Sequence, residues 1–415
     1  MNDTMFLALM DPAGAPAHPL IFLVLGVVTF ALHMTAVNVM LGTLGLSAWG
    51  SFSQNPYWQR LAGALGTTAK VAVSLAIVLG VAPLLFVQVV YDPFWYTSNV
   101  ISAWWLLGFL AILTVAYLAL YRYYVLKHRY AQDGTALPVH GAPRGGLWLV
   151  GSFVLMVTCG VIMHAVVNQS LQPGEWMNWY APNGVVDPHG RELHSITVAR
   201  VAFFLLLSVP VTAGWLFGMR RYLLSSGEED YGYIDFIENL AHNMARVGSV
   251  LVFVAGAAWM ATLPETMVWF RSSVWMVLAL VPLAYFAAMS FIQKKRVLCI
   301  FCNYMAFGMT LIMTIVLATI REILRFVTLL EAAGWDALAY KVNMDWSSTV
   351  IFFVTFLVVG GLNLTYLLTL AWKSGQTKEV YVPSLGLSRV GTMALVSLVL
   401  WVVGYFAIGI TVLNS

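Results

Sequence analysis

Long apolar stretches, separated by short polar connections, dominate the pattern of this chain. The apolar residues follow one another without the period-2 alternation of a half-exposed strand, which favours helices. About 20 apolar residues suffice for a helix to cross a bilayer. We therefore expect an all-α polytopic bundle of about ten transmembrane helices. They are predicted to begin near His18, Thr67, Val100, Gly146, Ser195, Asn243, Val274, Cys299, Ser348 and Val390.

Composition points to the same class. Hydrophobic residues make up 60% of the 415 residues and charged residues only 9%, whereas soluble domains carry roughly 25% charged residues. The net charge of +3 comes from scattered basic residues, so nucleic acid is not an expected partner. The longest connection, from about Gln169 to His194, is too short for a soluble domain. We expect a single transmembrane domain over residues 1–415.

Basic residues in the short loops predict the orientation, because cytoplasmic loops are rich in Lys and Arg. Fifteen of the 21 Lys and Arg residues fall on one predicted side, which we take as cytoplasmic. Both termini are then expected on the outer side of a bacterial inner membrane. The segment Met1–Ala17 does not resemble a cleavable signal peptide. The six remaining basic residues are Arg191, Arg200, Arg271, Arg321, Arg325 and Lys341.

Histidines are the first candidates for chemistry, because ionisable side chains inside a membrane are costly. Of the eight histidines, the four that fall within or at the ends of predicted helices, away from the cytoplasmic side, are His18, His33, His164 and His194. Histidines that converge in an apolar bundle are a common way to hold haem. The alternative is a packed histidine that is bonded to a neighbouring backbone carbonyl.

Methionine is the other common haem ligand, although most of the 19 methionines must fill the core. Met276 and Met267 stand out because they lie near the outer end of the seventh predicted helix, on the same side as His164 and His194.

Other reactive groups give weaker signals. Cys299 and Cys302 form a C-x-x-C pair, but zinc and iron–sulfur sites need four ligands. A redox role for the pair stays open. Asp92, Glu265 and Glu322 are assigned to helix ends, and acids are expected to be absent from the helix interiors. That distribution argues against a proton pump or an ion-coupled transporter.

Several segments together resemble subunit I of the cytochrome bd quinol oxidases over about three quarters of the chain. They are Thr29–His33, Gly80–Ala82, Asp92–Trp95, His194 and Met276. The resemblance implies that His33 takes the place of a ligand of the oxygen-reducing haem pair. It also implies that His194 and Met276 take the places of the low-spin haem b ligands. His164 is extra to the family pattern and is a candidate replacement for a lost ligand.

The departures from that family concern oxygen and quinol chemistry. The stretch Ala103–Leu107 carries no acid where the family has glutamates. The region Met313–Arg325 has no Gly-Arg-Gln-Pro-Trp motif where the family has that motif after a buried glutamate. The loop Pro264–Ser273 is much shorter than the family's quinol loop.

The expected function is therefore a membrane subunit of a respiratory complex that binds one or two haems b. It would pass electrons between the quinone pool and an outer-side c-type cytochrome or iron–sulfur partner. The haem-binding bundle is expected at about residues 18–327, with two accessory helices at about 348–412. Two alternatives stay open: a divergent terminal quinol oxidase, and a haem-free transporter or membrane anchor.

Overall fold

The computed structural model describes residues 9–132, 143–291, 302–374 and 381–413. Within these ranges the chain is helical, and its only β-pairing is an isolated bridge between Ala15 and Val342. Nine of the described helices are long and apolar enough to span a membrane. The number is ten if Glu265–Ser272 and Val274–Met289, which meet at 72°, form one span. The prediction of an all-α multi-pass membrane protein with about ten helices is confirmed.

The first compact unit comprises Met1–Pro12, Pro19–Arg221 and Asp230–Tyr340. Its principal helices are α2 (Pro19–Ser51), α3 (Pro56–Val90), α4 (Asp92–Ile101), α5 (Ala103–Gln132), α6 (Pro143–Gln169), α8 (Val198–Leu206), α9 (Ser208–Ser225), α10 (Tyr231–Ala261), α11 (Val274–Met289) and α12 (Cys302–Ala333). Short helices η1 (Pro173–Glu175), α7 (Trp176–Tyr180) and η2 (Pro182–Gly184) lie between α6 and α8, η3 (Glu265–Ser272) precedes α11, and η4 (Ala337–Ala339) follows α12.

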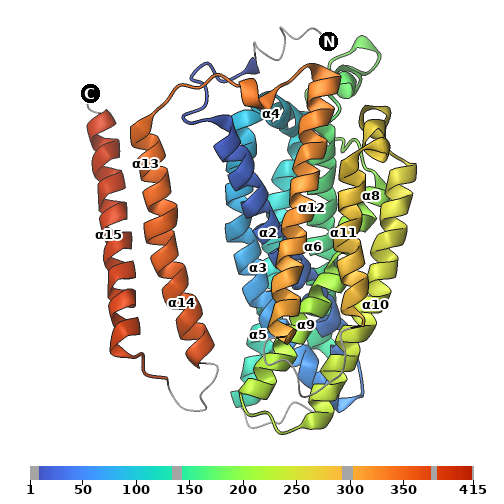
Figure 1. The fold of residues 1–415 in the computed structure, drawn as a ribbon, viewed down its shortest axis with the longest axis vertical. Coiled ribbons are helices and arrows are strands. Elements are labelled where there is room, and N and C mark those ends of the chain that lie inside the picture. The colour runs from blue at the N-terminus through green and yellow to red at the C-terminus, as the bar shows by residue number, and fades with distance from the viewer. Residues whose placement is uncertain (1–8, 133–142, 292–301, 375–380, 414–415) are drawn as a thin grey trace. The chain divides into compact units, whose positions relative to one another are not determined.

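Helix α2 lies at the centre of this unit and packs against α3, α6 and α12 (Figure 1). Small residues allow the close approaches, as is usual between membrane helices. A Cβ at Gly42 of α2 would collide with the Thr212 side chain of α9. Helix α3 begins sharply because the Asn55 side chain accepts a hydrogen bond from the Tyr57 backbone N–H and Pro56 opens the helix.

The corner between α3 and α4 joins segments that are distant in sequence. The buried Asp92 carboxylate accepts hydrogen bonds from the Asp11 backbone N–H at 2.8 Å and from the Tyr340 hydroxyl at 2.9 Å. The Trp335 indole N–H donates to the Val90 carbonyl oxygen at 3.1 Å. Burial raises the pKa of Asp92 above its usual 3.8. These bonds tie the residues that precede α2 and follow α12 to one end of α3.

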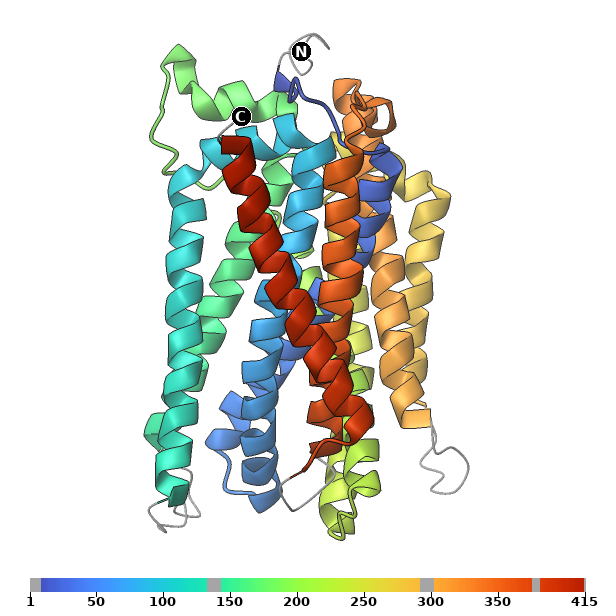
Figure 2. The same ribbon diagram turned by 90° about the vertical axis from the view of Figure 1, so that its left-hand side faces the viewer.

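The second compact unit comprises Ala13–His18, Tyr222–Glu229 and Lys341–Ser415. It contains α13 (Trp346–Val354), the π-helical turn η5 (Thr355–Gly360), α14 (Gly361–Ser374) and α15 (Leu385–Leu413). Helix α15 packs across η5 and α14, as Figure 2 shows. The Trp401 indole N–H donates to the Thr355 hydroxyl at 2.5 Å. The two predicted accessory helices fall in this unit.

Candidate functional site

A cavity of about 440 Å³ lies inside the first unit, among α2, α3, α5, α6, α8 and α12. This volume is within the roughly 300–1,000 Å³ of typical cofactor and ligand sites. Most of the lining is apolar. Among the described lining residues, the ionisable side chains other than Tyr91 and Cys159 are His33, His164, Arg200, Arg321, Glu322 and Arg325.

His33 projects from α2 toward α3. Its Nδ1 atom lies 2.8 Å from the Ala76 carbonyl oxygen. Since a carbonyl only accepts, Nδ1–H donates and the neutral ring keeps a lone pair on Nε2. Gly80 makes room for the ring, because a Cβ there would lie 2.8 Å from Cε1 of His33.

This hydrogen bond is compatible with both predicted roles of His33. A metal-ligating histidine usually donates its second N–H to a carbonyl or carboxylate, which fixes the tautomer and orients the ring. A packed structural histidine makes the same bond. The feature that favours a ligand is the cavity, which His33 lines together with a second imidazole.

That second imidazole belongs to His164, near the end of α6. Its Nε2 atom is buried and has no hydrogen-bond partner. A buried polar atom without a partner is costly, and it is the kind of atom that a bound metal would satisfy. The structure thus brings His33 and His164, which lie 131 positions apart in sequence, to one apolar cavity.

Four charged residues also line the cavity. Arg200 is only 4% exposed, and its guanidinium donates to the Asn168 side-chain oxygen. Arg325 and Arg321 share one oxygen of Glu322, with nitrogen–oxygen distances of 3.4 and 3.8 Å. The other carboxylate oxygen of Glu322 is buried and has no partner.

These residues correct the sequence analysis. Glu322 was assigned to a helix end, and the three arginines were counted as outer-side charges. Arg321, Glu322 and Arg325 instead lie in the second half of the 30-residue helix Tyr304–Ala333, before its end, and their side chains are 11–15% exposed. Charge inside a predicted span marks function by default, and this signal would have found Arg200, which falls within the helix predicted to begin near Ser195.

His194 and Met276 occupy other places. The His194 ring stacks on Trp179, with centroids 5.1 Å apart and planes 5° apart. Its backbone N–H donates to the Gln169 side-chain oxygen at 2.9 Å. Partial burial lowers the pKa of His194 below 6.5. Met276 is half-buried in the first turn of α11. Neither residue is among those that line the cavity of His33 and His164.

Among the described residues, no group of three or more His, Cys, Asp or Glu side chains is placed to hold a metal ion. Haem is a different case, because the porphyrin supplies four of the iron ligands and the protein only one or two. Cys299 lies outside the described residues, and Cys302 begins α12.

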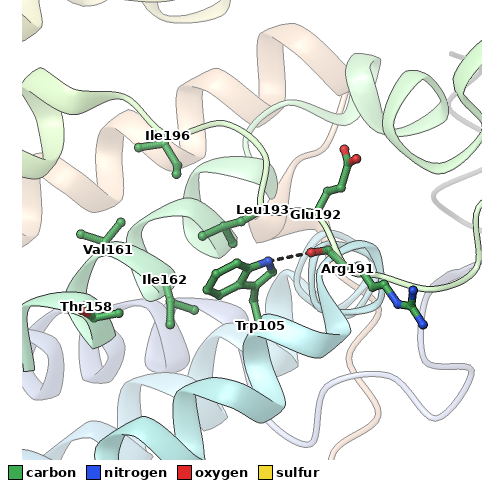
Figure 3. Close-up of a pocket in the computed structure, with 8 residues that line it drawn as sticks. All are labelled: Trp105, Thr158, Val161, Ile162, Arg191, Glu192, Leu193 and Ile196. Carbon is green, nitrogen blue, oxygen red and sulfur yellow. Dashed lines mark hydrogen bonds between the residues drawn. The ribbon is translucent and has the colours of Figure 1, made fainter. Parts of the chain in front are cut away.

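A second concave region is an open groove of about 560 Å³ on the opposite face of α6. The Trp105 indole N–H donates to the Arg191 carbonyl oxygen at 2.8 Å. Figure 3 shows the Arg191 and Glu192 side chains pointing away from the apolar residues. Val161 and Ile162 of α6 line the groove, whereas the neighbouring His164 lines the cavity. One helix therefore separates the two.

Comparisons with known proteins do not assign the chain to a family. A scan against protein-family models found no match, and a search of curated proteins found no significant match.

Proposed function

We propose that the protein is a haem-b-binding subunit of a respiratory electron-transfer complex in a bacterial inner membrane. The observation that carries the proposal is the apolar cavity shared by His33 and His164. Histidine is a common axial ligand of haem, and an apolar surrounding excludes water and tunes the redox potential.

The residues that line the cavity fit this cofactor. Nε2 of His33 carries the free lone pair, because Nδ1 is bonded to Ala76. Nε2 of His164 lacks a partner. A haem in this cavity would be held through these two nitrogen atoms, and it would supply one-electron transfer. The remaining wall, with residues such as Phe30 and Met163, would keep water from the macrocycle.

A second haem with His194 and Met276 as ligands remains part of the proposal. It rests on the resemblance to the cytochrome bd subunit, and these ligands lie outside the cavity of His33. We assign the first haem to His33 and His164 and treat the second as a separate site.

The proposed electron partners are quinone and an outer-side c-type cytochrome or iron–sulfur protein. Quinone dissolves in the bilayer and would reach the protein from the lipid. The groove at Trp105 and Ile162 supports this part of the proposal, because it is apolar, open, and only one helix from the cavity.

The direct test is a reduced-minus-oxidised spectrum of the full chain purified with its native partners, together with a pyridine haemochrome assay. We expect a haem b signal with at least one haem per chain. Absence of haem would exclude the proposal and favour a haem-free transporter or membrane anchor.

One observation favours a second candidate, a divergent terminal quinol oxidase. Glu322 gives the cavity of His33 an acid, in the region where the resemblance implies a buried glutamate. A reduced haem that binds carbon monoxide, together with oxygen uptake driven by quinol, would support the oxidase. A spectrum unchanged by carbon monoxide would support electron transfer alone.

A further inference from the structure

The charges that line the cavity do not balance. Arg200, Arg321 and Arg325 each carry a full positive charge, because a guanidinium stays protonated in proteins. Glu322 is the only acid among the described lining residues. Even with Glu322 ionised and both histidines neutral, two positive charges are left without a counter-charge.

The hydrogen bonds that the arginines make do not remove this imbalance. Arg321 and Arg325 both use the same oxygen of Glu322. Arg200 donates to a neutral amide, Asn168, while its Nε atom is buried without a partner. Arg200 and Arg325 are also close enough to repel each other. Buried unpaired charge is strongly unfavourable, so the cavity is suited to an anionic ligand.

The positive charges gather on one side of His33. The Arg321 guanidinium lies 4.0 Å from the ring centroid of Phe30, one helical turn before His33 on α2. The Arg325 guanidinium lies 5.1 Å from the ring of Tyr91. Gly80 lies against the His33 ring. Tyr91 is eleven positions further along the chain, which corresponds to about 16 Å along a helix. The guanidinium groups of Arg321 and Arg325 therefore lie along the part of the cavity between Phe30, beside His33, and Tyr91.

A ligand that fits this lining has an apolar body, a metal that accepts an imidazole lone pair, and anionic groups along one edge. Haem b has this constitution, with two propionate carboxylates on one edge of the macrocycle. Guanidinium groups bind carboxylates with paired hydrogen bonds, which give orientation as well as affinity.

We propose that Arg200, Arg321 and Arg325 bind the two propionates of the haem and orient the macrocycle so that its iron meets His33. This inference rests on the proposed function, since it names the protein groups that recognise the anionic edge of the same cofactor. The phosphate of an anionic lipid offers similar chemistry and is the competing occupant that the experiment must separate.

The experiment compares full-length Arg200→Gln and Arg325→Gln variants with wild type. Arg191→Gln is the matched control, because Arg191 is exposed and is not among the residues that line the cavity. Haem content and midpoint potential are measured on each. We expect about tenfold weaker haem retention in the cavity variants, from the loss of a charge-assisted hydrogen bond. We also expect a lower potential, because positive charge favours the reduced haem.

Reconstitution identifies the source of the anion. Full-length protein produced without haem is loaded either with haem b or with its dimethyl ester, in which both propionates are blocked. Wild type should prefer haem b by about tenfold or more, and Arg325→Gln should reduce that preference. Arg325→Lys keeps the positive charge but lacks the planar guanidinium group. It should therefore restore the midpoint potential of the haem more fully than the preference for haem b over its dimethyl ester.

The outcomes separate the two claims. A wild type without haem would overturn the proposed function. A haem-loaded wild type that takes the dimethyl ester equally well, and whose arginine variants keep their haem and potential, would overturn only the present inference. If the dimethyl ester is taken up equally well and phospholipid co-purifies with wild type but not with Arg325→Gln, the site would be assigned to a lipid phosphate.

Discussion

The imidazole of His33 is held against α3 by a hydrogen bond of 2.8 Å from Nδ1 to the carbonyl oxygen of Ala76. The bond joins the middle of α2 to α3 and sets which ring nitrogen is left for the cavity. Gly80 lies one turn further along α3 and leaves the space that the ring fills.

Replacement of Gly80 by alanine should therefore displace the His33 ring. The new Cβ would lie 2.8 and 2.9 Å from two ring atoms, closer than side chains pack without adjustment. We expect the free energy of unfolding to fall by about 1–3 kcal/mol, as in other overpacked interiors. Haem content should fall as well, because the displaced His33 ring no longer directs its Nε2 atom into the cavity as in the wild type.

The matched control is Gly108→Ala on α5, where a Cβ would meet nothing within 4 Å. Thermal unfolding in detergent and the haemochrome assay check both variants. Equal stability and equal haem content in the two variants would contradict the assigned role of Gly80.

His33→Ala and His164→Ala should each remove or alter the haem in this cavity, because each deletes a proposed iron ligand. We expect the haem b signal of this cavity to be lost, or to convert to a high-spin spectrum where one ligand remains. The measurement is the reduced-minus-oxidised spectrum, and His189→Ala serves as control because His189 is exposed and bonded to Asp187. Unchanged spectra in both cavity variants would remove His33 and His164 as ligands.

Part of this arrangement follows from the sequence in simple physical terms. The length of the apolar stretches predicted the helices, since the bilayer requires every backbone polar group to be hydrogen-bonded within its own segment. The cost of a histidine in lipid singled out His33 and His164. Their convergence on one cavity depends on how α2 and α6 are rotated about their axes, which hydropathy does not specify.

The arginines were missed for a related reason. A span of about 20 residues that begins near Cys299 ends close to Arg321, so Arg321 and Arg325 looked like charges at a membrane boundary. The observed α12 has 32 residues and continues to Ala333, which places both arginines within the helix, where their side chains line the cavity.

Tyr340→Phe should weaken the attachment of the segment after α12 to the α3–α4 corner. It removes the 2.9 Å hydrogen bond to the buried Asp92 carboxylate, and a buried acceptor that loses a donor costs about 1–3 kcal/mol. Thermal unfolding of the variant checks this. Tyr96→Phe, which removes an exposed hydroxyl, should leave stability nearly unchanged.

The same corner should make stability depend on pH. Burial raises the pKa of Asp92 above 3.8, so the folded state binds its proton more tightly than the unfolded chain does. The contribution of Asp92 to the free energy of unfolding is fully present at pH values below its pKa in the unfolded chain. It is lost as the pH rises through its higher pKa in the folded state. Asp92→Asn should flatten that decline. A decline equally steep in wild type and Asp92→Asn would show that another group is responsible.

Glu322 should set the redox potential of a haem in the cavity through its negative charge. Glu322→Gln removes a negative charge from the lining of the cavity, and the more positive surroundings favour the reduced haem. We therefore expect a higher midpoint potential than in wild type, the opposite of the shift expected for Arg325→Gln. Potentiometric titration of the haem band measures both, with Glu331→Gln as control because Glu331 is exposed on the same helix. A lower potential in Glu322→Gln would contradict this electrostatic role. Loss of carbon monoxide binding in that variant alone would instead indicate that the carboxylate acts at an oxygen-reducing haem.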